Sequence, residues 1–142
     1  MKSFLVFLFG SVVMFSCNEN DALRNEELPQ SWKLVKMTGS FQGSETTGDE
    51  MAWQETIVFN LNGTFIKTRV RDESTTSASG VFTPADPESG NIIVLTYNES
   101  NILRASCSGD LTEHLGVTED GTVLYGTWNA CDGPGLEYRR ID

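Results

Sequence analysis

From Ser31 onward, short runs of β-branched, aromatic and aliphatic residues alternate with clusters of Gly, Asn and Asp, and this pattern constrains the fold more than any other feature of the chain. No stretch of ten residues has apolar residues at the i, i+3, i+4 and i+7 spacing of an amphipathic helix. The runs instead have the length and composition of β-strands. We predict nine strands, over residues 32–38, 53–60, 64–71, 79–83, 91–97, 102–107, 111–117, 122–128 and 136–141.

The segments between these runs have the composition of tight turns, as in residues 60–63 (Asn-Leu-Asn-Gly) and 119–121 (Glu-Asp-Gly). Consecutive strands joined by such turns form antiparallel hairpins. A row of short antiparallel strands must protect its edges by packing as a sandwich or by closing, and a meander of hairpins closes most simply as an up-and-down barrel. We therefore expect an all-β fold over residues 31–142, an antiparallel up-and-down barrel of eight or nine strands, with the long loop 37–51 over one mouth.

The N-terminus has the pattern of an export signal. Lys2 is followed by a nearly uninterrupted apolar run over residues 4–15. As a helix this run would rise about 18 Å, which is too short for a hydrocarbon core of roughly 30 Å. We interpret residues 1–16 as a signal peptide that is absent from the mature protein.

The apolar run ends at Ser16-Cys17, which resembles a bacterial lipobox of the relaxed kind found in Bacteroidetes. The resemblance implies that Cys17 carries a diacylglyceryl thioether and anchors the protein to a membrane of the bacterial cell envelope, with the outer membrane expected. Residues 17–30 then form the lipidated Cys and a flexible tether, whose residues 18–29 hold four acids and one base. This acidic stretch is similar to a surface-export signal, but it also fits a solvated spacer, so the membrane face stays open. The alternative is an ordinary secretory signal with Cys17 as a free thiol.

Three cysteines would leave one unpaired in an exported protein, and assigning Cys17 to the lipid removes the difficulty. Cys107 and Cys131 then form a disulfide in the oxidising envelope compartment. A zinc site is the weaker interpretation, because two thiols and a single His cannot supply four ligands without added carboxylates.

Four segments, at residues 31–35, 59–65, 79–82 and 138–141, together resemble the small lipocalin-like lipoproteins of Bacteroidetes, and the resemblance spans nearly all of residues 31–142. In lipocalins a Trp on the first strand closes the barrel floor, and an Arg from the last strand lies over it. The resemblance assigns these roles to Trp32 and to Arg140 or Arg139, while Gln30 stands where lipocalins have Gly. It implies a lipocalin-like barrel that binds a small ligand.

Several kinds of chemistry lack support in the sequence. Twenty acids against ten bases give a net charge of −10, which repels a nucleic-acid backbone. His114 is the only His, and Glu113 would point to the opposite face of its strand, so the two cannot act together as base and orienting carboxylate. Phosphate-binding glycine motifs and complete calcium loops are absent. We expect no enzymatic activity, no metal and no cofactor.

One cationic stripe stands out. Lys67, Arg69 and Arg71 alternate with Ile66, Thr68 and Val70, so the three bases share one face of a strand. Facing the lumen, they could orient a ligand carboxylate or phosphate. Facing solvent, they would leave Ile66 and Val70 directed inward. Burying three like charges without partners is costly, so the outward arrangement is expected.

Two functions remain from the sequence. The first is a non-enzymatic envelope lipoprotein that binds a small apolar or amphipathic ligand in the barrel. The second is a barrel filled by its own side chains that binds another envelope protein or a glycan through loops such as 37–51 or 72–80. For the first function, the candidate ligand-binding residues are the basic pair and the strand aromatics: Arg69, Arg71, Trp53, Phe59, Phe65, Tyr97, Tyr125 and Trp128.

Overall fold

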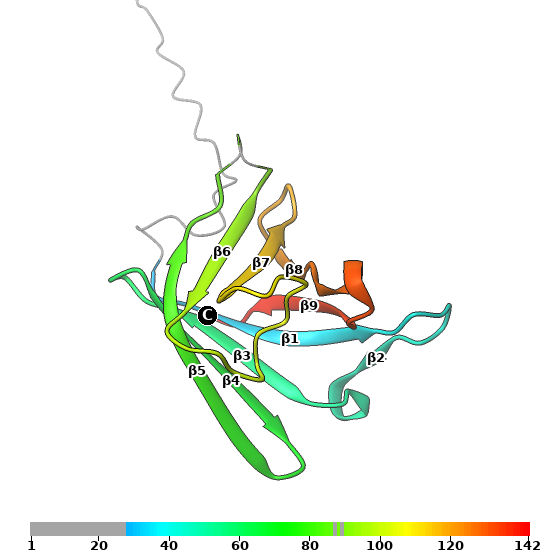
Figure 1. Ribbon diagram of the computed structural model, residues 1–142. Coiled ribbons are helices and arrows are strands. Elements are labelled where there is room, and N and C mark those ends of the chain that lie inside the picture. The colour runs from blue at the N-terminus through cyan, green and yellow to red at the C-terminus, as the bar shows by residue number, and fades with distance from the viewer. Residues whose placement is uncertain (1–27, 87, 89) are drawn as a thin grey trace, which may run out of the picture.

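The computed structural model describes residues 28–86, 88 and 90–142. The predicted signal peptide, the lipidation site Cys17 and most of the predicted tether lie outside these residues. The described chain folds into nine β-strands and two short 3₁₀ helices (Figure 1). The strands are β1 (Gln30–Thr38), β2 (Thr46–Thr47), β3 (Gln54–Phe59), β4 (Thr64–Arg71), β5 (Ser74–Thr83), β6 (Ile92–Tyr97), β7 (Thr112–Val117), β8 (Val123–Gly126) and β9 (Gly135–Arg140), and the helices are η2 (Gly48–Glu50) and η4 (Trp128–Cys131).

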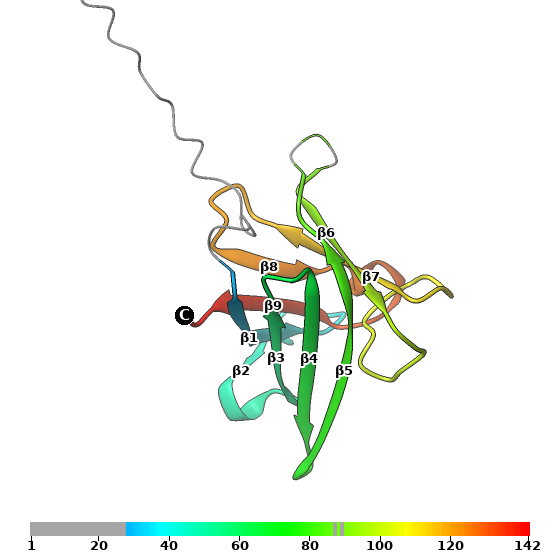
Figure 2. The same ribbon diagram turned by 90° about the vertical axis from the view of Figure 1, so that its left-hand side faces the viewer.

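The strands form one antiparallel sheet that closes on itself, as predicted. β1 pairs with β3, each strand from β3 to β8 pairs with the next along the chain, and β9 pairs with β1 to close an eight-stranded barrel (Figures 1 and 2). β2 is an extra strand that pairs with Lys36 and Met37 of β1, beyond the four β1 residues that pair with β3. The predicted all-β up-and-down barrel is therefore confirmed.

The structure corrects the starts of two predicted strands. β1 begins at Gln30, one residue inside the predicted tether. β5 begins at Ser74, so most of the predicted loop 72–80 is strand. The reason is the two-residue turn at Asp72 and Glu73, which have φ of 49° and 63° and join β4 to β5 as a tight hairpin.

The predicted strand over residues 102–107 is wrong. Residues 98–111 form the long connection between β6 and β7, which carries no strand. Side chains satisfy its backbone in place of a strand ladder: Asn101 Oδ1 accepts hydrogen bonds from the backbone N–H groups of Leu103 and Arg104. We call residues 98–111 the lid loop because of its position, described below.

Alternate residues of the strands point into the barrel and form a continuous core. Trp32, Ile57, Phe59, Phe65 and Tyr138 are among the side chains with 1% exposure or less. An eight-stranded barrel has an interior just wide enough for side chains to fill it or for one small ligand to be held. What occupies the middle of the barrel therefore bears on function. No helix in the described part of the chain is long and apolar enough to span a membrane.

Candidate functional site

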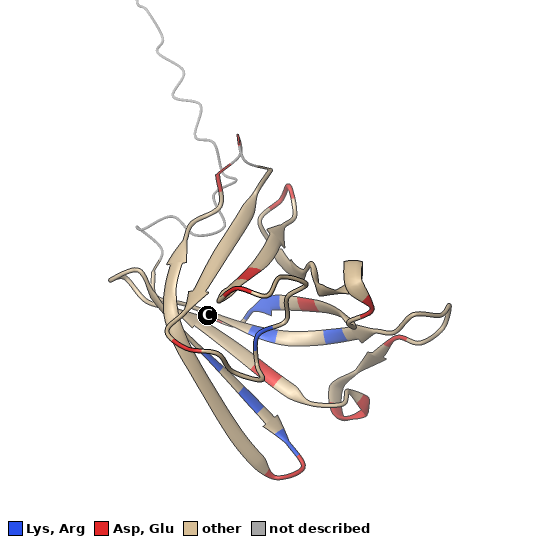
Figure 3. Ribbon diagram, in the orientation of Figure 1, with Lys and Arg blue, Asp and Glu red and all other residues tan. Residues whose placement is uncertain are grey.

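Four charged side chains meet inside the barrel, beneath one of its mouths. They are Glu55 of β3, Lys67 and Arg69 of β4, and Glu113 of β7, and we call them the luminal ion cluster. Figure 3 shows the basic residues spaced along β4 beside an acidic position on β3. Lys67 Nζ lies 2.8 Å from Glu113 Oε1 and 3.1 Å from Glu55 Oε1, and Arg69 Nε donates to Glu55 Oε2 at 2.6 Å. The side chains of Lys67, Glu55 and Glu113 are fully buried.

Neutral donors complete the hydrogen bonds of the two carboxylates. Tyr138 Oη donates to Glu55 Oε1 and Tyr97 Oη donates to Glu113 Oε2, each at 2.6 Å. The backbone N–H of Ala105, in the lid loop, also donates to Glu113 Oε2 at 3.1 Å. Two acids and two bases balance in charge, and donors approach both carboxylates from several strands. A buried polar network that is satisfied in this way makes the surrounding structure rigid.

The charges around Glu55 and Lys67 favour the ionised form of each of these two groups. Burial by itself raises the pKa of Glu55, but the neighbouring charges of Lys67 and Arg69 outweigh it and hold the pKa below the ordinary value. Burial lowers the pKa of Lys67, but Glu113 and Glu55 outweigh it, so the pKa is raised. Burial beside Glu113 raises the pKa of Tyr97, which keeps its phenol a donor.

The inward direction of Lys67 and Arg69 overturns our expectation. The Lys67 side chain is fully buried and that of Arg69 is 11% exposed, whereas Ile66 and Val70 point outward with 45% and 43% exposure. The expectation assumed buried bases without partners, and Glu55 and Glu113 are those partners. Arg71 lies beyond the cluster, where its side chain is 60% exposed next to Asp72.

The lid loop covers the barrel mouth above the cluster. Its residues Leu103 and Ala105 are fully buried. Arg69 reaches the carbonyl oxygens of Ile102 and Leu103 with its two Nη atoms at 3.4 and 3.5 Å. The predicted disulfide between Cys107 and Cys131 is present and ties the lid loop to η4. The β6–β7 connection, in place of the predicted loop 37–51, thus contacts Arg69 and Glu113 at this mouth.

Trp53 lies at the same mouth, just before β3. The Arg69 guanidinium carbon is 4.2 Å from the centre of its ring, which is a cation–π contact. Trp53 is 9% exposed, and its indole Nε1 is buried without a hydrogen-bond partner among the described residues. This donor is one of the few polar groups near the lid that the barrel does not satisfy itself.

The other predicted ligand-binding aromatics divide between core and surface. Phe59 and Phe65 point inward and meet other rings edge to face, Phe59 with Phe82 at 4.9 Å and Phe65 with Tyr97 at 5.0 Å between ring centres. Tyr125 is on the outer wall and 43% exposed. These rings therefore do not form one site.

Three further predicted residues lie near the edges of the barrel. Trp128 is half-buried on η4. Trp32 is buried at the opposite end of the barrel, and its indole Nε1 donates to Gln30 Oε1 at 3.1 Å. Arg140 lies directly across from Trp32 on β9, at the closing seam.

Sequence reasoning missed Glu55, Glu113 and Tyr138. Glu55 alternates with Ile57 and Phe59, and Glu113 alternates with Leu115, so the period of two marks both as inward-facing. The same alternation places Lys67 on the face of Phe65. Acidic and basic residues at inward-facing positions of different strands were therefore the signal from which the luminal ion cluster could have been predicted.

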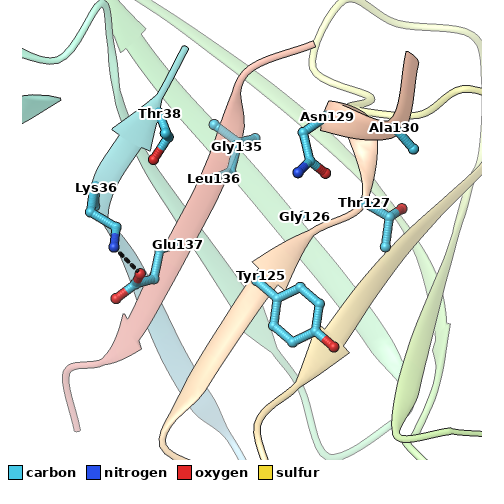
Figure 4. A pocket seen from close by; sticks show the side chains of 10 residues that line it. All are labelled: Lys36, Thr38, Tyr125, Gly126, Thr127, Asn129, Ala130, Gly135, Leu136 and Glu137. Carbon is cyan, nitrogen blue, oxygen red and sulfur yellow. Dashed lines mark ion pairs between the residues drawn. The ribbon is translucent and has the colours of Figure 1, made fainter. Parts of the chain in front are cut away.

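A groove of about 410 Å³ lies on the outer wall of the barrel, between β1, β9, β8 and η4 (Figure 4). We call it the outer groove, and its lining residues are Lys36, Thr38, Tyr125, Gly126, Thr127, Asn129, Ala130, Gly135, Leu136 and Glu137. Lys36 Nζ and Glu137 Oε2 pair at 2.7 Å along one side. A second hollow of about 400 Å³ on the outside of β6 and β7 shares Thr127 with it.

The fold and the lumen define a small antiparallel up-and-down barrel with an ion-paired interior and a disulfide-tied lid loop. No protein-family model, no curated protein and no solved structure matches the chain. Among the described residues, no three His, Cys, Asp or Glu side chains gather as a group that could hold a metal ion.

Proposed function

We propose that the protein is a non-enzymatic, lipocalin-like lipoprotein of the bacterial cell envelope whose filled barrel serves as a scaffold for binding a partner on its outer surface. The luminal ion cluster is the observation that carries this proposal. In the interior where an open barrel of this size would hold a small ligand, Lys67, Glu55 and Glu113 are fully buried and paired with one another.

The energetics of the cluster favour a closed lumen. An apolar ligand placed there would separate ion pairs of 2.6–3.1 Å and leave charges without partners in a dry interior. Breaking a buried ion pair in this way costs about 3–5 kcal/mol, which the burial of a small apolar molecule would have to exceed. The cluster is therefore better suited to fixing the shape of the barrel than to releasing and taking up cargo.

The location in the envelope is supported by the N-terminal sequence and by the disulfide. We propose that residues 1–16 are removed, that Cys17 carries the lipid and that the anchor lies in the outer membrane. The Cys107–Cys131 bridge fits an oxidising compartment outside the cytoplasm. Fractionation of a Cys17→Ala variant tests the anchor: the variant is expected in the soluble fraction, and continued membrane attachment would contradict lipidation.

A second candidate function is the binding of a small amphipathic ligand under the lid loop. The buried indole Nε1 of Trp53 favours it, because an unpaired donor beside the Arg69 guanidinium suits a carboxylate or carbonyl oxygen. Such a ligand would require the lid loop to move away from Arg69.

Native mass spectrometry of the protein purified from its own envelope distinguishes the two functions. For a filled scaffold we expect the mass of the lipidated polypeptide alone, under conditions in which a control lipocalin keeps its ligand. A stoichiometric small molecule, lost when Trp53 is replaced by Phe, would overturn the scaffold function in favour of the second candidate.

A further inference from the structure

The outer groove is separate from the luminal ion cluster and has the size and walls of a ligand-binding site. Its volume of about 410 Å³ is within the range of small-molecule sites, roughly 300–1,000 Å³. Gly135 belongs to the outward-facing face of β9 and has no side chain, so the wall is hollow between Thr38 on one side and η4 on the other (Figure 4). The disulfide at Cys131 fixes η4 to the lid loop, which gives the groove one rigid wall.

An exposed aromatic ring stands at one end of the groove. Tyr125 is directly paired with Gly116 of β7, and a Cβ atom at Gly116 would overlap the Tyr125 ring. The ring therefore packs over the bare backbone at Gly116, a place that only glycine leaves open. It is held against the wall while 43% of the residue remains exposed, which makes it a fixed apolar platform facing solvent.

The remaining polar groups of the groove are neutral or already paired. Glu137 neutralises Lys36 at 2.7 Å and also lies 3.6 Å from Arg139 Nη2. Thr127 donates its hydroxyl to the His114 carbonyl at 3.1 Å and keeps its lone pairs as acceptors. Within residues 28–86, 88 and 90–142, no hydrogen bond engages the side chains of Thr38 and Asn129. The groove thus offers donors and acceptors without an unpaired charge.

We propose that the outer groove binds a neutral saccharide of one or two sugar units. The Tyr125 ring provides the surface on which the C–H face of a sugar ring stacks, and Thr38, Thr127 and Asn129 provide hydrogen-bonding groups for its hydroxyls. The absence of an unpaired cation among the lining residues disfavours phosphate and carboxylate ligands, and a mostly apolar wall with a few polar side chains suits a sugar ring, which has an apolar C–H face and a rim of hydroxyl groups. The inference rests on the proposed function, because it names the partner that the outer surface of the scaffold binds.

The test uses the mature lipidated protein in nanodiscs and a panel of neutral disaccharides: maltose, cellobiose, lactose, mannobiose and N,N′-diacetylchitobiose. Saturation-transfer NMR identifies binders, and calorimetry gives their affinities. We expect at least one disaccharide to bind, with an affinity that does not change between 50 mM and about 500 mM salt, because no net charge is involved.

Variants test whether the disaccharide binds in the outer groove. Tyr125→Ala is expected to weaken it roughly ten-fold or more, the scale of an aromatic anchor residue, whereas Tyr125→Phe keeps the ring and most of the affinity. Gly116→Ala displaces the ring without removing it and is expected to weaken binding as well. Phe41→Ala is the matched control, because Phe41 is an aromatic residue with 74% exposure that does not line the groove.

Two sets of outcomes overturn the inference. The first is that no disaccharide in the panel binds, or that binding is unchanged in both Tyr125→Ala and Asn129→Ala. The second is that binding weakens with salt and inorganic phosphate competes, which would make the groove an anion site. Neither outcome contradicts the scaffold function, which fails separately if native mass spectrometry finds a stoichiometric ligand that is lost in Trp53→Phe. Asn129 is exposed on η4, so its replacement tests the groove even where Tyr125→Ala does not fold.

Discussion

Replacing Lys67 by Met removes the central cation of the luminal ion cluster while keeping the length and volume of an unbranched side chain. Glu113 then loses contacts at 2.8 and 3.1 Å, and Glu55 loses one at 3.1 Å. Glu55 keeps Arg69 and Tyr138, so the uncompensated charge falls on Glu113. Removing one member of a buried ion pair costs about 3–5 kcal/mol, and for a domain of this size that lowers Tm by roughly 10–20 °C.

The assay is urea unfolding followed by circular dichroism at pH 7 with the disulfide intact, analysed as a two-state transition. The double variant Lys67→Met with Glu113→Gln removes the stranded charge and is expected to recover a large part of the loss. Lys33→Met is the control on the outer wall, where a change within about 0.5 kcal/mol is expected. A Lys67→Met variant as stable as the Lys33→Met control, or a double variant no better than the single one, would refute the closed cluster.

Two further predictions concern pH and the lid loop. Because the pKa of Glu55 is lower in the folded state, its ionised form stabilises the fold at pH values above the unfolded pKa of about 4.3, and this contribution is lost as the pH falls through the folded pKa. Urea midpoints measured from pH 7 to 3 should therefore fall more steeply in the wild type than in Glu55→Gln. Equal slopes would contradict the stabilising role of ionised Glu55. The raised pKa of Lys67 gives the opposite sign, a contribution present below about pH 10.4 and lost as the pH rises through the higher folded pKa. Replacing both Cys107 and Cys131 by Ser removes the cross-link between two residues that are 24 positions apart, and should lower the free energy of unfolding by about 3–3.5 kcal/mol. Hydrogen exchange should then increase most in residues 98–111, and protection unchanged there would show that the bridge does not hold the lid loop.

The barrel was predictable because the sequence signals for its strands and turns lie within single hairpins. Each hairpin has its own turn, as where Gly63 adopts φ of 80° between β3 and β4, and a meander of hairpins has few ways to close. The cysteine pairing was predictable by elimination. The error over residues 102–107 has a different origin: the apolar residues Leu103 and Ala105 are buried as in a strand, but Asn101 and Glu113 take the backbone N–H groups that a strand would pair.

The luminal ion cluster was not predictable from one strand at a time. Lys67 on β4 meets Glu113 on β7, 46 residues later in the chain, and the cost of burying the base depends entirely on that distant partner. The outer groove is also a product of closure, because β1 and β9 come together only in the complete barrel. Alternation along each strand indicated which residues point inward, but not which of them would meet.

The most direct test of the filled barrel is the exchange behaviour of the Lys67 ammonium group, measured by ¹⁵N NMR at a pH of about 8. A fully buried ammonium held by two carboxylates exchanges slowly with water, so one lysine Nζ resonance is expected to persist while those of exposed lysines vanish, and it should disappear in Lys67→Met. Fast exchange at every lysine would mean that water reaches the middle of the barrel, and the filled scaffold would then be wrong.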